Sequence, residues 1–233
     1  MNLPDYWMPR PSASLDEEVR SSFDALLARI RSGGEDALIS YTLPFPKWQF
    51  LCYAAEQHAI ALHGTGDPNI HVFEPRQSND LNEFGNRKAV YAAGDGIWAM
   101  FFAIIDRVRY PMTISNACIR LSDSTSFVSE PLYVFSISQT QLPHRPWRRG
   151  YVYLLPADTF SSQPTFSFGS YEVHVPQLAS LVEVKPLAML DVAPEDFPFL
   201  AQIRSHDDDR LAELSQALQT GGPWPEPKSR ADE

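Results

Sequence analysis

Hydrophobic positions recur with helical spacing in the first part of the chain. Between residues 14 and 31 they fall on one helical face, occupied by Leu15, Val19, Phe23, Leu26, Leu27 and Ile30. Ser14 and Glu17 form a candidate capping box at the start of this helix, and Gly33 follows its end. Comparable patterns predict further helices over residues 47–57, 95–107 and 207–219.

The pattern changes to short, β-rich runs after residue 109, separated by turns that contain Pro, Ser and Asp. Two shorter apolar runs, at 59–62 and 89–92, precede this region. A helical first third followed by a strand-rich remainder predicts an α+β fold. We expect one domain over residues 1–220 and a flexible tail over 221–233. The later runs cover residues 113–121, 132–138, 151–155, 166–175 and 181–192.

Composition narrows the classes of protein that fit this pattern. The chain has 233 residues, 44% of them hydrophobic, which excludes a largely disordered protein. Its 19 basic and 29 acidic residues give a net charge of −10, which argues against a dedicated nucleic-acid surface and against docking on an anionic membrane. The longest apolar stretch, residues 96–105, is about half the ~20 residues of a membrane span. We therefore expect a cytoplasmic protein.

Cysteine and histidine usage does not point to a metal centre or a disulfide framework. Cys52 and Cys118 are the two cysteines, and neither belongs to a Cys-x-x-Cys motif. The six histidines show no metal-ligand spacing. The one basic cluster, residues 144–149, is expected to be a solvated loop, with contact to a phosphate or a nucleic-acid acceptor as the alternative.

The candidate chemistry lies between residues 59 and 107. A predicted buried strand ends near His63, and Gly64 follows, where backbone amides can approach a ligand closely. Tyr91 lies on a second short strand, and Phe102 lies on the helix after it. Each residue alone is more typical of ordinary core packing, but together they could frame a flat ligand with polar edges.

The order of these residues resembles the ADP-ribosyltransferase superfamily, of the kind found in poly(ADP-ribose) polymerase catalytic domains. The matching elements are His63-Gly64-Thr65, then Gly85, then Val90-Tyr91-Ala92-Ala93, then Phe102 on a helix. The resemblance covers residues 58–107, and the remainder only by its order of strands. It implies a split, mixed β-sheet core with N-terminal helices, and NAD as substrate.

The resemblance also implies a role for each matching residue. His63 would hydrogen-bond a ribose hydroxyl on the adenosine side of NAD. Gly64 would hold the nicotinamide carboxamide through its backbone N–H and C=O, and Thr65 would assist ribose or amide binding. Tyr91 and Phe102 would enclose the nicotinamide ring between their faces.

Two positions depart from the family pattern. Ala99 stands where the family often has a serine that bonds the carboxamide, so that contact would be lost. The third residue of the family's His-Tyr-Glu set is predicted at Gln177, with Glu172 as the competing candidate. Glutamine would keep a hydrogen bond to the ribose but supplies neither negative charge nor a base.

The function implied by the resemblance is NAD-dependent mono-ADP-ribosyl transfer to water or to an unknown acceptor, either a protein or a nucleic-acid-derived group. One alternative is a non-catalytic NAD- or nucleotide-binding interaction module on the same fold. A further alternative is an RNA-end-processing phosphotransferase of related fold, which would need several basic residues around the pocket.

Overall fold

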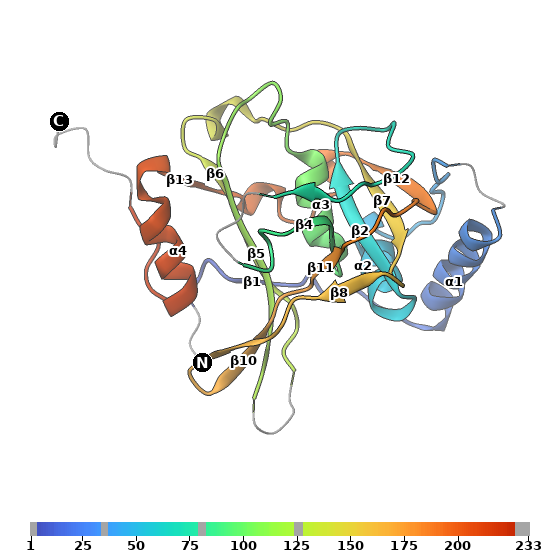
Figure 1. Cartoon of the computed structure of the whole chain (residues 1–233), viewed down its shortest axis with the longest axis horizontal. Helices are drawn as coiled ribbons and strands as arrows, with labels where there is room; N and C mark the ends of the chain where they lie inside the picture. The colour runs from blue at the N-terminus through green and yellow to red at the C-terminus, as the bar shows by residue number, and fades with distance from the viewer. Residues whose placement is uncertain (1–3, 34–36, 79–82, 124–127, 227–233) are drawn as a thin grey trace.

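The computed structural model describes residues 4–33, 37–78, 83–123 and 128–226 and has an α+β architecture (Figure 1). The fold class predicted from the sequence is therefore confirmed at this level. The described residues include helices close to the four predicted ones. They are α1 (Glu17–Arg31), α2 (Lys47–Gln57), α3 (Gly96–Ile104) and α4 (Leu211–Thr220).

The described strands form two sheets. The first has the order β1-β6-β5-β10-β9, with β13 parallel to β6 and the other pairs antiparallel. Its strands are β1 (Met8–Pro9), β5 (Ile114–Ser122), β6 (Leu132–Ser138), β9 (Phe166–Phe168), β10 (Tyr171–His174) and β13 (Arg204–His206).

The second sheet has the order β12-β7-β2-β4-β11-β8, with β3 added to β4, and all its pairs are antiparallel. Its strands are β2 (Ile60–Thr65), β3 (Arg76–Gln77), β4 (Lys88–Ala93), β7 (Gly150–Pro156), β8 (Phe160–Ser162), β11 (Gln177–Ser180) and β12 (Ala188–Val192).

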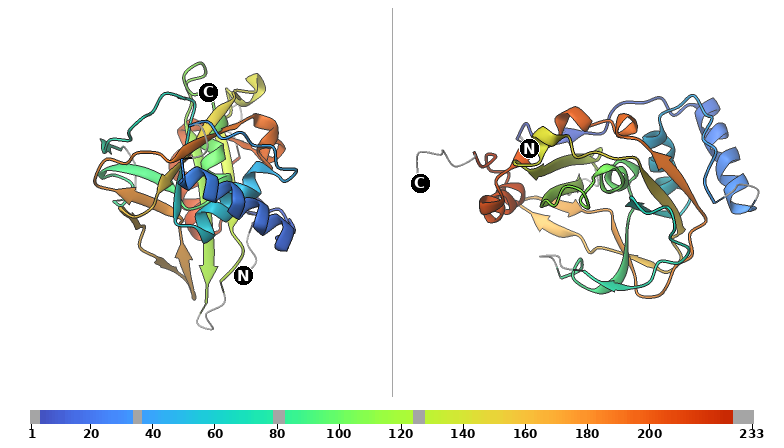
Figure 2. Two further views of the ribbon diagram at one scale, coloured as in Figure 1. Left: turned by 90° about the vertical axis from the view of Figure 1, so that its right-hand side faces the viewer. Right: turned by 90° about the horizontal axis from the view of Figure 1, so that it is seen from above.

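Helix α3 lies in the interior of the molecule, between the two sheets (Figures 1 and 2). Its residues are apolar on all sides, and every one except Phe102 is buried. The Phe101 ring lies 4.6 Å from the ring of Phe135 on β6 of the first sheet. On the other side, the α3 backbone contacts Gly64 on β2 of the second sheet. Because an all-apolar helix must be covered on every side, α3 joins both sheets into one core.

The helix ends differ from the predictions in instructive ways. Asp16, not Ser14, caps α1, and its carboxylate accepts a hydrogen bond of 3.1 Å from the Val19 N–H. The predicted capping box was therefore wrong. Helix α3 ends three residues earlier than predicted, because Ile105 turns to extended backbone and pairs with Trp147.

Two of the predicted strand runs also changed. The run over 166–175 is a hairpin of β9 and β10, whose turn uses the positive φ of Gly169 (+60°). The run over 181–192 contributes only β12. Residues 177–180, which were not predicted as a strand, form β11 through pairing with β4.

The expected flexible tail is anchored at its beginning. The Trp224 ring packs edge-on against Tyr6 at 5.4 Å, and its indole N–H donates to the Ser205 carbonyl at 3.3 Å. The Tyr6 hydroxyl in turn donates to the Gly222 carbonyl at 2.9 Å. The chain thus contacts the body of the protein as far as Glu226, whose carbonyl accepts a hydrogen bond from Arg210, and residues 227–233 lie outside the described residues.

No helix within the described ranges is long and apolar enough to cross a membrane. The same ranges contain no group of three or more His, Cys, Asp or Glu side chains placed to hold a metal ion. Cys52 and Cys118 are both free and buried, and burial raises the pKa of each thiol.

Candidate functional site

A small cavity lies where β2 and β4 diverge. Strand β2 pairs with β7 along its whole length, from Ile60 to Thr65, but it pairs with β4 only at Leu62↔Ala93. The cavity beside this point has a volume of about 160 Å³. Its walls come from β2, β4, α3 and the first residue of β11. The lining residues are Leu62, His63, Gly64, Tyr91, Ala92, Ala93, Trp98, Ala99, Phe102 and Gln177.

His63 is held across the gap between the two strands. Its Nδ1 lies 2.8 Å from the Tyr91 carbonyl oxygen. Because a carbonyl can only accept, Nδ1 carries the proton, and Nε2 of the neutral ring is a hydrogen-bond acceptor. The ring also packs against Phe73 at 4.8 Å. Burial lowers the pKa of His63 despite its hydrogen bond to Tyr91. His63 is therefore neutral at pH 7 and can accept a hydrogen bond from a ligand hydroxyl.

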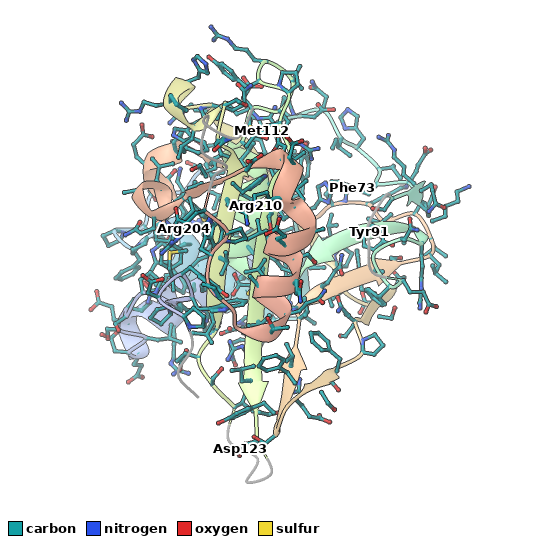
Figure 3. All side chains as sticks on the ribbon, turned by 90° about the vertical axis from the view of Figure 1, so that its left-hand side faces the viewer. Phe73, Tyr91, Met112, Asp123, Arg204 and Arg210 are labelled. Carbon is teal, nitrogen blue, oxygen red and sulfur yellow. The ribbon has the colours of Figure 1, made fainter. Side chains whose placement is uncertain are left out.

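Tyr91 is fixed by its hydroxyl group. The oxygen accepts a hydrogen bond from the Arg87 N–H at 2.7 Å, and the O–H donates to the Phe84 carbonyl at 2.9 Å. Figure 3 shows Tyr91 on the same side of the molecule as Phe73. With the hydroxyl held by the turn before β4, the half-buried ring is left as an apolar wall of the cavity.

Helix α3 supplies two aromatic walls. Phe102 and Trp98 are four residues apart, which places them on one helix face, and their ring centres lie 6.3 Å apart. The Trp98 indole N–H donates to the Asn116 side chain at 2.6 Å, so its ring orientation is fixed. Sequence analysis predicted Phe102 but missed Trp98, although the i, i+4 spacing to Phe102 was available to find it.

Gly64 is required by the packing of helix α3 against β2. A Cβ atom on Gly64 would lie 1.9 Å from the Ala99 carbonyl oxygen and 2.9 Å from the Ala103 nitrogen. The close approach inferred from the sequence is therefore made by the α3 backbone. Thr65 does not line the cavity, and its hydroxyl accepts a hydrogen bond from the Asp67 N–H at 3.2 Å.

The two candidates for the third position lie in different sheets. Gln177 opens β11, opposite Ala93 of β4, and lines the cavity together with His63 and Tyr91. Glu172 is exposed on β10 of the other sheet, opposite Ser122, and does not line the cavity. The structure thus brings Gln177, and not Glu172, to the other predicted residues.

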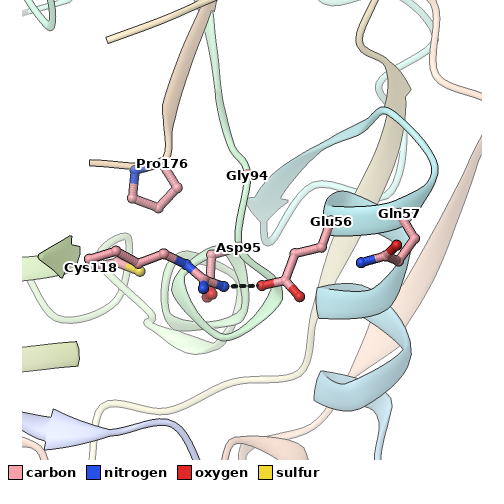
Figure 4. Close-up of a pocket in the computed structure, with 7 residues that line it drawn as sticks. Glu56, Gln57, Gly94, Asp95, Cys118 and Pro176 are labelled. Carbon is pink, nitrogen blue, oxygen red and sulfur yellow. Dashed lines mark hydrogen bonds and ion pairs between the residues drawn. The ribbon is translucent and has the colours of Figure 1, made fainter. Parts of the chain in front are cut away.

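A second, more polar cavity of about 350 Å³ lies beyond the Gly94–Pro176 contact (Figure 4). The acidic groups at this cavity are paired. Glu56 forms ion pairs with Arg10 and Arg120, and the buried Asp95 accepts hydrogen bonds from Arg10 at 2.6 Å and from Tyr133 at 2.8 Å. Asp95 also caps α3 through the Trp98 N–H. This network holds the helix that lines the first cavity. The lining residues are Glu56, Gln57, Gly94, Asp95, Cys118, Arg120 and Pro176.

The first cavity differs in chemistry from the second. None of its lining residues carries a charge when His63 is neutral, and most of its surface is aromatic or aliphatic. Its polar groups are the Nε2 of His63, the Gln177 amide and main-chain atoms. Such a site suits a flat group that has a few polar atoms at its edge.

No known protein family, curated protein or solved structure matches this chain.

Proposed function

We propose that the chain binds NAD and catalyses mono-ADP-ribosyl transfer, with ADP-ribose passing to an acceptor or to water. The observation that carries the proposal is the convergence of His63, Gly64, Tyr91, Phe102 and Gln177 on one cavity. All five are residues to which the resemblance to ADP-ribosyltransferases assigns a role. The divergence of β2 from β4 at the cavity supports the finer assignment to that family's split-sheet fold.

The size of the cavity supports a ring-sized occupant. An apolar protein cavity of about 150 Å³ is large enough to bind benzene, and this one measures about 160 Å³. It would enclose a nicotinamide ring and leave the rest of the dinucleotide outside. The ring of NAD is cationic, and the faces of Tyr91, Trp98 and Phe102 would favour a cation in this otherwise uncharged site.

The proposed chemistry is cleavage of the bond between nicotinamide and ribose. Positive charge develops on the ribose as the neutral ring leaves, and oxygen from the acceptor or from water forms the new bond. The acceptor keeps the ADP-ribose, and its displaced proton passes to solvent. The acceptor atom of His63 would fix a ribose hydroxyl. The Gln177 amide oxygen would stabilise the developing charge only weakly, because it carries no net charge.

A second candidate function is NAD binding without turnover. Gln177 favours it, because the chain places a neutral amide where a carboxylate would help most. The two functions share one binding site and differ in whether nicotinamide is released.

Calorimetric titration with NAD, followed by measurement of nicotinamide release, tests both functions. Tyr91→Ala removes a ring face and should weaken NAD binding about tenfold, by analogy with aromatic pairs. His63→Ala should weaken binding about three- to tenfold through the lost hydrogen bond. Tyr171→Ala and His174→Ala, on β10 of the other sheet, are the matched controls and should bind NAD like the wild type.

Each outcome decides between the candidates. Release of nicotinamide by the wild type that is lost in His63→Ala supports the enzyme. Binding without release supports the binding module. If NAD does not bind to the folded wild-type protein, both candidates are wrong.

A further inference from the structure

Two loops that are distant in sequence form a single arginine-rich surface. The segment after α3 and the segment before β7 are joined by the Ile105↔Trp147 bridge. Further backbone bonds run from the Asp106 N–H to the Pro146 carbonyl at 3.0 Å and from the Arg148 N–H to the Ile104 carbonyl at 2.8 Å. We define the arginine surface as the exposed residues Arg107, Arg109, His144, Arg145 and Arg149 with the half-buried Tyr110.

The charge of this region is opposite to that of the whole protein. Residues 106–110 and 141–149 hold five of the 19 basic residues and one of the 29 acidic residues. They therefore carry a charge of +4, and the rest of the chain carries −14. The net charge of −10 does not reveal this separation, because it is the sum of the charges of the two regions.

Most of the exposed guanidinium groups lack a close carboxylate. Among the described residues, neither Arg107 nor Arg145 forms an ion pair. Arg149 is 74% exposed, with Asp191 4.0 Å away. Asp106, the one acidic residue of the two loops, caps the Arg109 N–H at 3.0 Å. The positive charge is thus left to attract an external polyanion.

An aromatic pair lies within the arginine surface. The Tyr110 and His144 rings are nearly parallel, at 16°, with their centres 6.2 Å apart. The Arg109 guanidinium lies 5.3 Å from the centre of the Tyr110 ring. Stacking faces among arginines are typical of surfaces that bind single-stranded nucleic acid, because bases stack on the rings while the backbone phosphates contact the cations.

The arginine surface adjoins the candidate site through Arg148. The Arg148 guanidinium fills the space in which a side chain at position 66 would lie. A Cβ atom built on Gly66 would be 2.0 Å from the Arg148 Cζ. Its Nε also lies 3.4 Å from the Ala103 carbonyl oxygen. Gly66 and Ala103 are both close in sequence to residues that line the cavity. Gly66 lies two residues after Gly64, and Ala103 directly follows Phe102. The arginine-rich region thus contacts residues that are next to the cavity lining in sequence, which places the two regions side by side.

From this juxtaposition we propose that the arginine surface binds single-stranded nucleic acid and presents it as the acceptor of ADP-ribose. The binding stands on the charge and the aromatic pair alone. The acceptor role rests on the proposed function. The expectation from net charge that the protein lacks a nucleic-acid surface is replaced by this proposal.

Fluorescence anisotropy with a labelled twelve-nucleotide single strand of mixed sequence tests the binding without NAD. With about four phosphate contacts to the exposed arginines, affinity should fall about 50-fold between about 50 and 200 mM salt. Replacing Arg107, Arg109, Arg145 and Arg149 together by alanine should abolish most of this binding and its salt dependence. A matched quadruple variant, with alanine at Arg20, Arg29, Arg31 and Lys185, makes the same change in net charge elsewhere and should bind like the wild type.

The aromatic pair has its own test. Tyr110→Ala should weaken binding of the strand about five- to a hundredfold through lost stacking, and Tyr110→Phe should retain it. Equal binding of a polyglutamate peptide would show a surface for acidic proteins and overturn the proposal. Failure of the wild type to bind the strand at low salt, or equal binding by the two quadruple variants, would also overturn it.

The acceptor role is tested with labelled NAD and the same strand. Transfer of label to the strand should be lost in the arginine-surface variant, while nicotinamide release to water continues. If the wild type releases nicotinamide and binds the strand but never labels it, the acceptor role is wrong and the proposed function stands. If NAD itself does not bind, the proposed function fails, and the anisotropy result still decides whether the surface binds nucleic acid.

Discussion

Replacing Gln177 by glutamate tests whether the missing negative charge limits the proposed reaction. The side chain at position 177 lines the cavity beside His63 and Tyr91. A glutamate differs from glutamine mainly by its charge, so the variant changes electrostatics with little change in volume. We expect NAD to bind with similar affinity and nicotinamide to be released faster.

The size of the effect follows from Coulomb's law. A carboxylate about 5 Å from a unit positive charge, at an effective dielectric constant of about 20, stabilises that charge by about 3 kcal/mol. Part of this gain is lost, because the introduced carboxylate leaves water for a site with largely apolar walls. Gln177 is only half-buried, so the loss is partial. The nicotinamide ring of bound NAD is already cationic, so only part of the remaining energy is gained in the transition state. We expect a net gain of about 1.4 kcal/mol, which corresponds to about tenfold faster release.

The assay is nicotinamide release at saturating NAD, measured from pH 5 to pH 9. The apolar walls should raise the pKa of the introduced carboxyl above the ordinary glutamate value of about 4.3, so the gain should disappear toward acid pH. Gln177→Met, which is neutral and similar in volume, should give no gain. Glu172→Gln should leave the rate unchanged, because Glu172 lies in the other sheet. A folded Gln177→Glu variant that binds NAD but is no faster at any pH would refute the electrostatic reasoning.

Three further predictions concern the framework around the site. Gly64→Ala should destabilise the protein by about 3 kcal/mol or more in urea unfolding, because its Cβ would lie 1.9 Å from the α3 backbone; Gly94→Ala, whose Cβ would be 3.5 Å from its nearest neighbour, should cost less than about 1 kcal/mol. Arg10→Gln should cost about 3–5 kcal/mol by leaving the buried Asp95 without its cation, and an unchanged urea midpoint would contradict this. Burial lowers the pKa of His206, so protons favour the unfolded state and stability should fall as the pH drops below about 6.5; His206→Gln should reduce that slope by up to about 1.4 kcal/mol per pH unit, and a profile parallel to the wild type would count against it.

The sequence predicted most of the elements because their patterns are local. The helices follow from 3.6-residue periodicity, and α2 matches its predicted bounds, residues 47–57. Strand β11 was missed because the four residues Gln177–Ser180 show no clear alternation and become a strand only by pairing with β4. The packing constraint on Gly64 was missed for a similar reason, since the helix that fills its side-chain position lies some 35 residues further along the chain. Long-range packing decides both cases, and one sequence does not display it.

The placement of Gln177 shows how a register error of one strand would change the chemistry of the site. Strand β11 pairs with β4 so that Gln177 lies opposite Ala93, at the end of the sheet where β2 and β4 separate. The hydrogen bond from the Gly94 N–H to the Pro176 carbonyl, at 2.7 Å, fixes this register at its first residue. Because successive side chains of a strand point to opposite faces, a shift of one residue would direct Leu178 toward the cavity and remove its one side-chain amide. The hydrogen bond between Gly94 and Pro176 therefore determines which side chain of β11 faces the first cavity, and with it the polarity of that cavity. Gly94 and Pro176 thus help to build the site, although neither residue lines the first cavity.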